Sequence, residues 1–129
     1  MFEVDDFESE WLYSKPFDFI HARELEGCIA NEERLFKRVL EHLSPGGYFE
    51  IEAIYARFVS DDETDERAPN CQLWMKTLCE GMAQFGKPMD HAAQWKDMLK
   101  EAGFVDVQEE VFKVSRPPKS CRMCLWATH

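Results

Sequence analysis

One amphipathic helix between two strand patterns constrains the fold of this chain more than any other feature. Asn31 is suited to cap the helix, and apolar side chains then recur at the spacing of one helical face. These side chains are Leu35, Phe36, Val39, Leu40 and Leu43. The turn at 44–47, Ser-Pro-Gly-Gly, ends the helix because proline cannot continue it and glycine tolerates a left-handed cap. Strands are predicted at 17–21 and 48–54, and this strand–helix–strand succession indicates parallel strands joined by a right-handed crossover.

The rest of the chain continues the alternation of strands and helices. We predict a short strand at 2–4, amphipathic helices at 73–85 and 91–102, and a strand at 104–114. The aromatic residues expected in the core on these helices are Trp74, Phe85 and Trp95. The apolar positions of the last strand change parity midway, which indicates either a bulge or cover on both faces. The predicted fold class is therefore α/β, with a mostly parallel sheet and flanking helices.

Charge and cysteine content limit the partners of the chain. A net charge of -10 repels phosphate backbones and anionic lipids, so we expect no direct nucleic-acid or membrane partner. No apolar run approaches the roughly 20 residues that span a bilayer, and the acidic N-terminus does not resemble a signal peptide. Five cysteines at irregular spacing favour a reducing, intracellular compartment, cytoplasmic or nuclear. Cys121 and Cys124 form a lone C-x-x-C pair, which is too few ligands for a zinc site, and we predict no metal.

Polar residues follow or end three of the predicted strands, where ligands bind in open parallel sheets. Asp5 and Asp6 follow the first strand. Their carboxylates can accept hydrogen bonds from a ribose hydroxyl or from an adenine amino group. The alternative is that they only make the surface soluble. In the triplet 21–23, His-Ala-Arg, the histidine can act as a base and the arginine can bind an anion. The alternative is that the histidine is a packed structural residue and the arginine pairs with a nearby carboxylate. Glu50 and Glu52 share one strand face and suit acid–base or metal chemistry, although ion pairing with a helix-borne Lys or Arg is the simpler interpretation. The acidic run at 61–66 lacks the pattern of a calcium loop.

Seven segments together resemble class I methyltransferases of the fungal LaeA-like group. These segments are 2–6, 11–13, 16–23, 43–50, 60–62, 101–107 and 109–113. The resemblance implies a partial Rossmann-like sheet and S-adenosylmethionine as the cofactor. It implies that the acidic pair Asp5 and Asp6 lies at the adenine, with Asp6 as the residue that contacts the adenine amino group. It also implies that the backbone of Phe7 contacts the adenine ring. It places His21, Ala22 and Arg23 along the sulfonium side of the pocket, and it identifies no catalytic residue.

The chain departs from the family pattern at both ends. No G-x-G turn is present among its six glycines, although the family uses such a turn to approach the cofactor closely. By resemblance, residues 1–114 are the C-terminal portion of a methyltransferase domain without its first two strands and its last strand, and 115–129 are a divergent tail. We therefore expect a methyltransferase-family protein that is incomplete as it stands and acts on an unknown small-molecule or protein acceptor. The alternative is a non-catalytic remnant or interaction module, and exposed sheet edges favour self-association in either case.

Overall fold

A computed structural model describes residues 4–60, 67–112 and the backbone of 122–128. The elements in chain order are β1 (Phe17–Arg23), α1 (Glu32–Glu41), β2 (Leu43–Ala53), α2 (Pro69–Gln84), the 3-10 turn η2 (His91–Gln94), α3 (Trp95–Ala102), β3 (Val105–Phe112) and β4 (Arg122–Thr128). Their alternation confirms the α/β class. The predicted strand at 2–4 lies outside the described residues except for Val4, which belongs to no strand.

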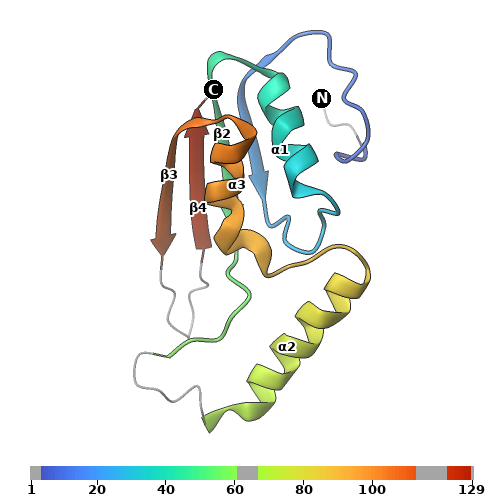
Figure 1. The fold of residues 1–129 in the computed structure, drawn as a ribbon, viewed down its shortest axis with the longest axis vertical. Coiled ribbons are helices and arrows are strands. Elements are labelled where there is room, and N and C mark those ends of the chain that lie inside the picture. Colours follow the sequence, from blue (N-terminus) through green and yellow to red (C-terminus); the bar gives the residue numbers. More distant parts are fainter. Residues whose placement is uncertain (1–3, 61–66, 113–121, 129) are drawn as a thin grey trace.

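The four strands form one sheet in the order β1-β2-β4-β3 (Figure 1). β1 and β2 are parallel, while β4 is antiparallel to both β2 and β3. Three strands therefore run in one direction and only β4 opposes them, which confirms a mostly parallel sheet.

β4 contradicts one prediction from the sequence. We expected no strand beyond residue 114, yet Arg122–Thr128 pairs along β2 on one side and β3 on the other. The resemblance to known sequences ends before this segment, but backbone pairing depends on N–H and C=O groups that every non-proline residue carries. The tail thus divides β2 from β3 and ties the last α/β unit to the central strands.

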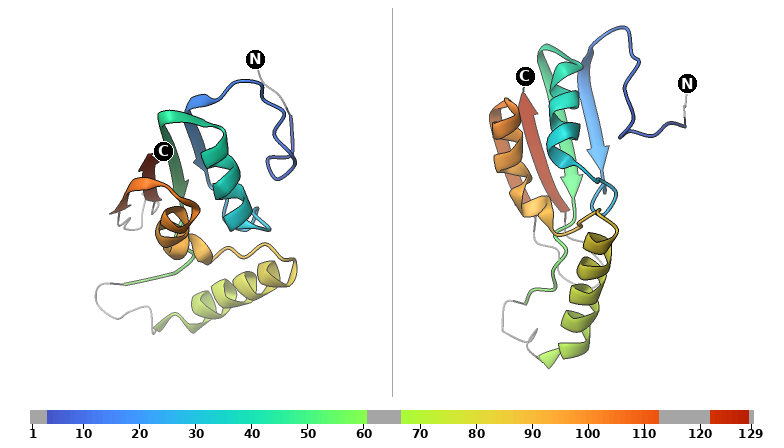
Figure 2. Two further views of the ribbon diagram at one scale, coloured as in Figure 1. Left: turned by 45° about the horizontal axis from the view of Figure 1, so that its top comes forward. Right: turned by 45° about the vertical axis from the view of Figure 1, so that its right-hand side comes forward.

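Helices α1 and α3 both cover the same face of the sheet (Figure 2). Their buried side chains meet those of β2 in a single core that includes Phe36, Trp95, Leu99, Phe49 and Ile51. Asn31 caps α1 as predicted, because its Oδ1 accepts a bond from the Arg34 N–H at 2.8 Å. The helix ends earlier than predicted, at Glu41, and Leu43 is buried as the first residue of β2.

The proline–glycine turn lies inside β2 rather than before it. Leu43 pairs with Phe17 and Tyr48 pairs with Phe19, so the intervening residues bulge out of the register. Gly46 has a positive φ of 80°, and a Cβ on Gly47 would lie 2.9 Å from the Ser44 carbonyl oxygen. These two glycines allow the chain to leave α1 and enter the sheet within a few residues.

α2 differs most from its predicted environment. It extends beyond the sheet in Figure 1, and none of its residues is buried. Trp74 is 58% exposed and Phe85 is 83% exposed, so the prediction that both lie in the core is wrong. Trp95 is buried as predicted, at the start of α3. Helical spacing identified an apolar stripe on α2 but could not show whether another element covers it.

The parity change in the last predicted strand is a bulge. The register of β3 against β4 shifts between Val105 and Gln108, and Asp106 there has a φ of 51°. β3 is an edge strand with exposed apolar side chains such as Val111, which excludes cover on both faces. Of the two alternatives, the bulge is confirmed.

Candidate functional site

The sheet face opposite α1 and α3 carries a row of chemically active side chains. Phe19 and His21 of β1 pair in register with Tyr48 and Glu50 of β2, and strand alternation directs all four to that face. The intervening residues, such as Phe49, face the core. Phe19 and Tyr48 are 53% and 56% exposed. Among the described residues, no helix covers this side of β1 and β2, which we call the open face.

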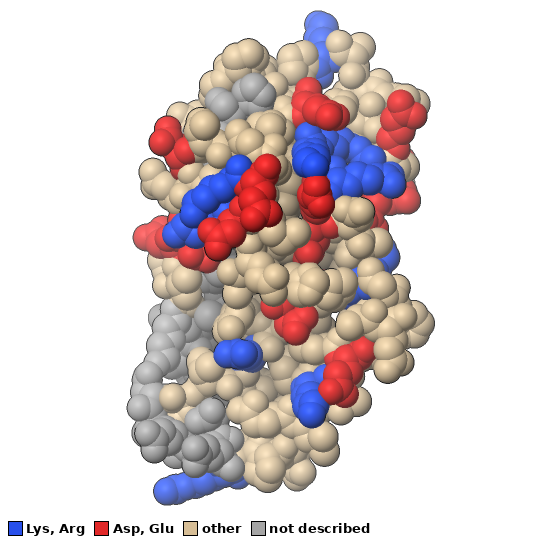
Figure 3. Space-filling model, in the orientation of Figure 1, with Lys and Arg blue, Asp and Glu red and all other residues tan. Residues whose placement is uncertain are grey.

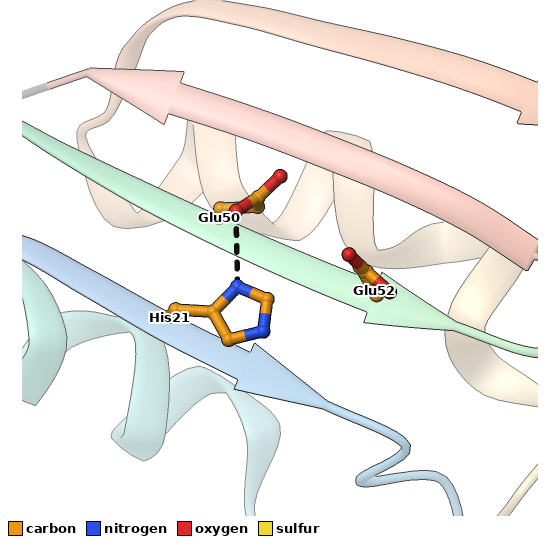
Figure 4. Close-up of side chains that lie close together, drawn as sticks. All are labelled: His21, Glu50 and Glu52. Carbon is orange, nitrogen blue, oxygen red and sulfur yellow. Dashed lines mark hydrogen bonds and ion pairs between the residues drawn. The ribbon is translucent and has the colours of Figure 1, made fainter.

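His21, Glu50 and Glu52 form a compact cluster on the open face (Figure 4). His21 Nδ1 lies 3.0 Å from Glu50 Oε2, and one donor atom from each of the three residues lies within 4.8 Å of the others. The Glu50 side chain is only 13% exposed, while that of His21 is 40% exposed. The shared face predicted for Glu50 and Glu52 is confirmed. The partner of Glu50 is a histidine on the neighbouring strand, not a cation from a helix.

The other members of the predicted 21–23 triplet lie in different surroundings. Ala22 points to the opposite face and packs against the core. Arg23 is exposed, and its Nε lies 3.9 Å from Glu24 Oε1. The structure therefore brings His21 and Arg23, but not Ala22, to the open face.

The carboxylates of Asp5 and Asp6 both make local bonds. Asp5 Oδ1 accepts from the Asp6 N–H at 2.8 Å, and Asp6 Oδ1 accepts from the Glu8 N–H at 2.9 Å. The Phe7 carbonyl accepts from Trp11 Nε1 at 2.9 Å and from Arg38 Nη1 at 3.3 Å. These bonds give the segment a defined shape and leave each carboxylate with a second oxygen.

Glu8 holds this segment against the body of the protein. Its Oε1 accepts from the Ala30 N–H at 2.7 Å, and its Oε2 lies 3.2 Å from Lys87 Nζ. Burial of the Glu8 carboxylate raises its pKa, but bonds from Ala30, Lys87 and Asn31 outweigh that effect and the net pKa is lowered. The sequence contained no local signal for this anchor, because its partners lie 22 to 79 residues away.

An aromatic groove of about 340 Å³ lies between the anchored segment and β1. Its lining residues are Asp5, Phe7, Trp11, Tyr13, Phe17, Phe19 and Ile20. Asp5 lines the groove and Asp6 does not. The Phe19 ring also lies 6.2 Å from the His21 ring, so the groove adjoins the cluster on the open face.

A second cleft, of about 600 Å³, was not predicted from the sequence. It lies between the chain that follows β2 and helices α2 and η2. Cys79 lines it, and burial, followed by the nearby Asp90 charge, raises the pKa of this thiol. The acidic run at 61–66 and Cys121 lie outside the described residues.

Glu26 links the connection between β1 and α1 to the end of β2. Its Oε1 accepts a bond from the Ile54 N–H. Burial raises the pKa of the Glu26 carboxyl, although that bond opposes the shift.

Charged side chains of both signs lie close together on the described surface. On the side that carries α1 and α3, acidic and basic side chains are interspersed (Figure 3), as in the pairs Lys37–Glu33 and Lys100–Asp97. Within the described residues, no helix is both long enough and apolar enough to cross a membrane.

Comparisons with known sequences show which proteins this chain is similar to. The sequence pattern of a methyltransferase domain matches residues 1–109. The probable methyltransferase tdiE of Emericella nidulans is 34% identical over 104 residues, which cover 81% of this chain and 32% of tdiE. The secondary metabolism regulator laeA of Fusarium oxysporum is 34% identical over 106 residues, which cover 74% of this chain and 32% of that protein.

A solved structure extends the comparison to the fold. The N-methyltransferase NodS of Bradyrhizobium japonicum, in complex with S-adenosyl-L-homocysteine, has a TM-score of 0.58 at 14% identity over 98% of this chain and 52% of NodS. The chain spans about a third of the length of the curated relatives it matches. With a family match over residues 1–109 and relatives at 34% identity, the chain belongs to the methyltransferase domain family, and the solved structure shows that its fold is Rossmann-like.

Proposed function

We propose that this chain supplies the adenine and sulfonium sides of an S-adenosylmethionine site and takes part in methyl transfer to an oxygen or nitrogen nucleophile. The observation that carries the proposal is the aromatic groove beside Asp5 and Phe7, which continues through Phe19 to His21 on the open face. Of the residues predicted to contact the cofactor, Asp5 and Phe7 line the groove and His21 lies next to Phe19 at its edge, while Asp6 does not line it and Ala22 faces the core.

The groove has the chemistry that the cofactor requires. Aromatic side chains offer flat apolar surfaces on which an adenine ring stacks, and the Asp5 carboxylate can accept a bond from its amino group. The sulfonium carries a positive charge, and ring faces such as those of Phe19 and Tyr48 attract cations.

Methyl transfer then depends mainly on geometry. When bound, S-adenosylmethionine would supply the methyl group, and the residues of this chain would hold the acceptor in line with it. Orientation of the two reactants supplies much of the lowering of the barrier. The open face beside His21 is where we place the acceptor, a small molecule or a protein side chain.

The proposed site needs a further segment for tight binding. The 129 residues contain no G-x-G turn, so these residues supply no such close backbone approach to the ribose and the methionine part. In the described residues β1 has a sheet neighbour only on its β2 side, and its outer edge is a place for a strand of such a segment or of a second copy. A catalytically inactive remnant is the alternative, and the bonds that engage Asp5 and Asp6 within their own turn favour it.

We also propose that the protein acts inside the cell, in the cytoplasm or nucleus. Cys28, Cys71 and Cys79 are all free thiols in the structure, which fits a reducing compartment. We propose further that it has no direct nucleic-acid or membrane partner, because a net charge of -10 repels phosphate backbones and anionic lipids.

Titration of the isotopically labelled chain with S-adenosyl-L-homocysteine, followed by NMR, tests the proposal. We expect weak binding, with a dissociation constant on the order of 1 mM, equivalent to about -4 kcal/mol. The shifted amides should include Phe7, Phe19 and His21, while those of α2 stay unchanged. Phe7→Ala should weaken binding, and the exposed Phe85→Ala on α2 should not. Absence of shifts along the groove at millimolar ligand, or equal effects of the two variants, would refute the proposal and favour the remnant.

A further inference from the structure

We propose that His21, Glu50 and Glu52 bind a divalent first-row transition metal ion on the open face. The proposal concerns binding of the ion by this chain and does not depend on whether the groove binds the cofactor. It revises the expectation from the sequence that the chain has no metal site.

The distances suit a single ion. A metal with bonds of about 2.0–2.2 Å to nitrogen and oxygen holds neighbouring ligand atoms roughly 3 Å apart. The 3.0 Å between His21 Nδ1 and Glu50 Oε2 already has this value. The third donor, from Glu52, lies within 4.8 Å of both, and rotation about the side-chain bonds of a glutamate can shorten that distance.

The strands hold the three residues in register. His21 pairs directly with Glu50, and Glu52 follows two residues later on the same face of β2. Both strands are also fixed from behind, since Phe49 and Ile51 of β2 are buried in the core and Ile20 and Ala22 of β1 pack against it. Ligands on paired strands are positioned more accurately than ligands on loops, which lowers the entropy cost of binding.

Charge also favours a divalent cation at this point. Two carboxylates on adjacent same-face positions repel each other, and Glu50 is largely withdrawn from solvent. A divalent ion carries enough positive charge to offset both carboxylates. Among the described residues, Arg23 on the same face pairs with Glu24 at 3.9 Å.

The donor set indicates the class of metal. One imidazole nitrogen with two carboxylates suits Mn²⁺ or Zn²⁺, while Ca²⁺ and Mg²⁺ prefer oxygen donors alone. Three protein ligands leave at least one coordination position open, and the 40% exposure of the His21 side chain gives access from solvent. An oxygen of a methyl acceptor is a suitable occupant of that position.

Titration with Mn²⁺ tests the proposal, because thiols compete poorly for this ion and the cysteines then do not confuse the result. We expect one bound ion per chain by electron paramagnetic resonance. Bound Mn²⁺ should broaden the NMR signals of 19–23 and 50–53 and leave those of α2 sharp. Glu52→Gln and His21→Ala should each weaken binding by at least about tenfold.

Glu33→Gln is the matched control, since Glu33 is an exposed acid on α1 that pairs with Lys37 and belongs to no cluster. Glu52→Gln preserves side-chain volume, so a folded variant is expected even where His21→Ala loses stability, and circular dichroism checks this. The proposal is overturned by no binding at millimolar Mn²⁺. It is equally overturned by binding that survives in Glu52→Gln, or by broadening elsewhere. The titration with S-adenosyl-L-homocysteine reports on the groove separately, so failure of one proposal does not imply failure of the other.

Discussion

A buried carboxylate at the start of α1 joins the two helices that cover the sheet. The Glu32 side chain is 7% exposed, and its Oε1 accepts a bond from Trp95 Nε1 at 2.7 Å. Its Oε2 lies 2.9 Å from His91 Nδ1. Trp95 is itself buried against Phe36, with the two rings 6.1 Å apart. Glu32 therefore fixes α3 against α1 by polar contacts inside an otherwise apolar core.

Glu32→Ala should lower the free energy of unfolding substantially. It leaves the buried indole N–H of Trp95 without an acceptor, at a cost of about 1–3 kcal/mol. It also removes a negative charge from the first turn of α1, which is worth about 0.3–1 kcal/mol more. We expect a total loss of roughly 1–4 kcal/mol. Glu32→Gln should fall between the two proteins, because its amide oxygen can still accept from the indole.

Glu33→Ala is a control that isolates the buried contacts. Glu33 lies in the same first turn, so its loss has the same effect on the helix dipole, but its ion pair with Lys37 is exposed. Urea unfolding followed by tryptophan fluorescence and by circular dichroism measures all three variants. The reasoning fails if Glu32→Ala and Glu33→Ala agree within about 0.5 kcal/mol, the usual range for surface substitutions.

Four further variants test other parts of the structure by urea unfolding. Gly47→Ala should destabilise the fold by about 1–3 kcal/mol, because its Cβ would lie 2.9 Å from the Ser44 carbonyl oxygen. Gly81→Ala on α2 has open space and should stabilise it by about 0.4–1 kcal/mol, and the same sign for both would contradict this account. Trp74→Ser should lower stability by no more than about 1.5 kcal/mol, since the side chain is more than half exposed and its ring contact is with Phe58, and a larger loss would mean that α2 is covered. Glu26→Gln should raise stability at pH 7. The pKa of the Glu26 carboxyl is raised on folding, so its contribution to stability is fully present below its unfolded pKa and is lost as pH rises through its folded pKa. The advantage of Glu26→Gln over the unchanged protein should therefore vanish below about pH 4, where the glutamate is also uncharged. A gain that persists in acid would refute that assignment.

The parts of the fold that sequence predicted well depend on local signals. The cap at Asn31, the apolar stripe of α1 and the glycine after α3 are each encoded within a few residues. The parity change in β3 was also local, and it appears as a bulge. Such features require no knowledge of distant partners.

The parts that sequence could not predict depend on what lies opposite in space. Trp74 has the spacing of a core residue, but it is 58% exposed, and its ring contacts that of the equally peripheral Phe58 at 6.2 Å instead of the core. The contact between His21 and Glu50 depends on the register of two strands separated by a helix, and a one-residue slip would have turned one of them to the core. Glu8 finds Lys87 only because the chain returns to it after 79 residues.

The position of β4 leads to the last prediction. A strand between β2 and β3 has its backbone bonded on both sides, whereas β1 has a described neighbour only on one side. Amides of 123–127 should therefore exchange with solvent at least as slowly as those of 19–22 in β1, and far more slowly than those of the loop at 5–10. Replacing Leu125, which pairs with both Ile51 and Glu109, by proline should remove this protection and detach β3, because proline donates no ladder bond and is excluded from central strands. Val111→Pro in edge strand β3 is the control and should be less harmful. If 123–127 exchange as fast as the loop, the tail is not a strand of this sheet, and the order β1-β2-β4-β3 is wrong.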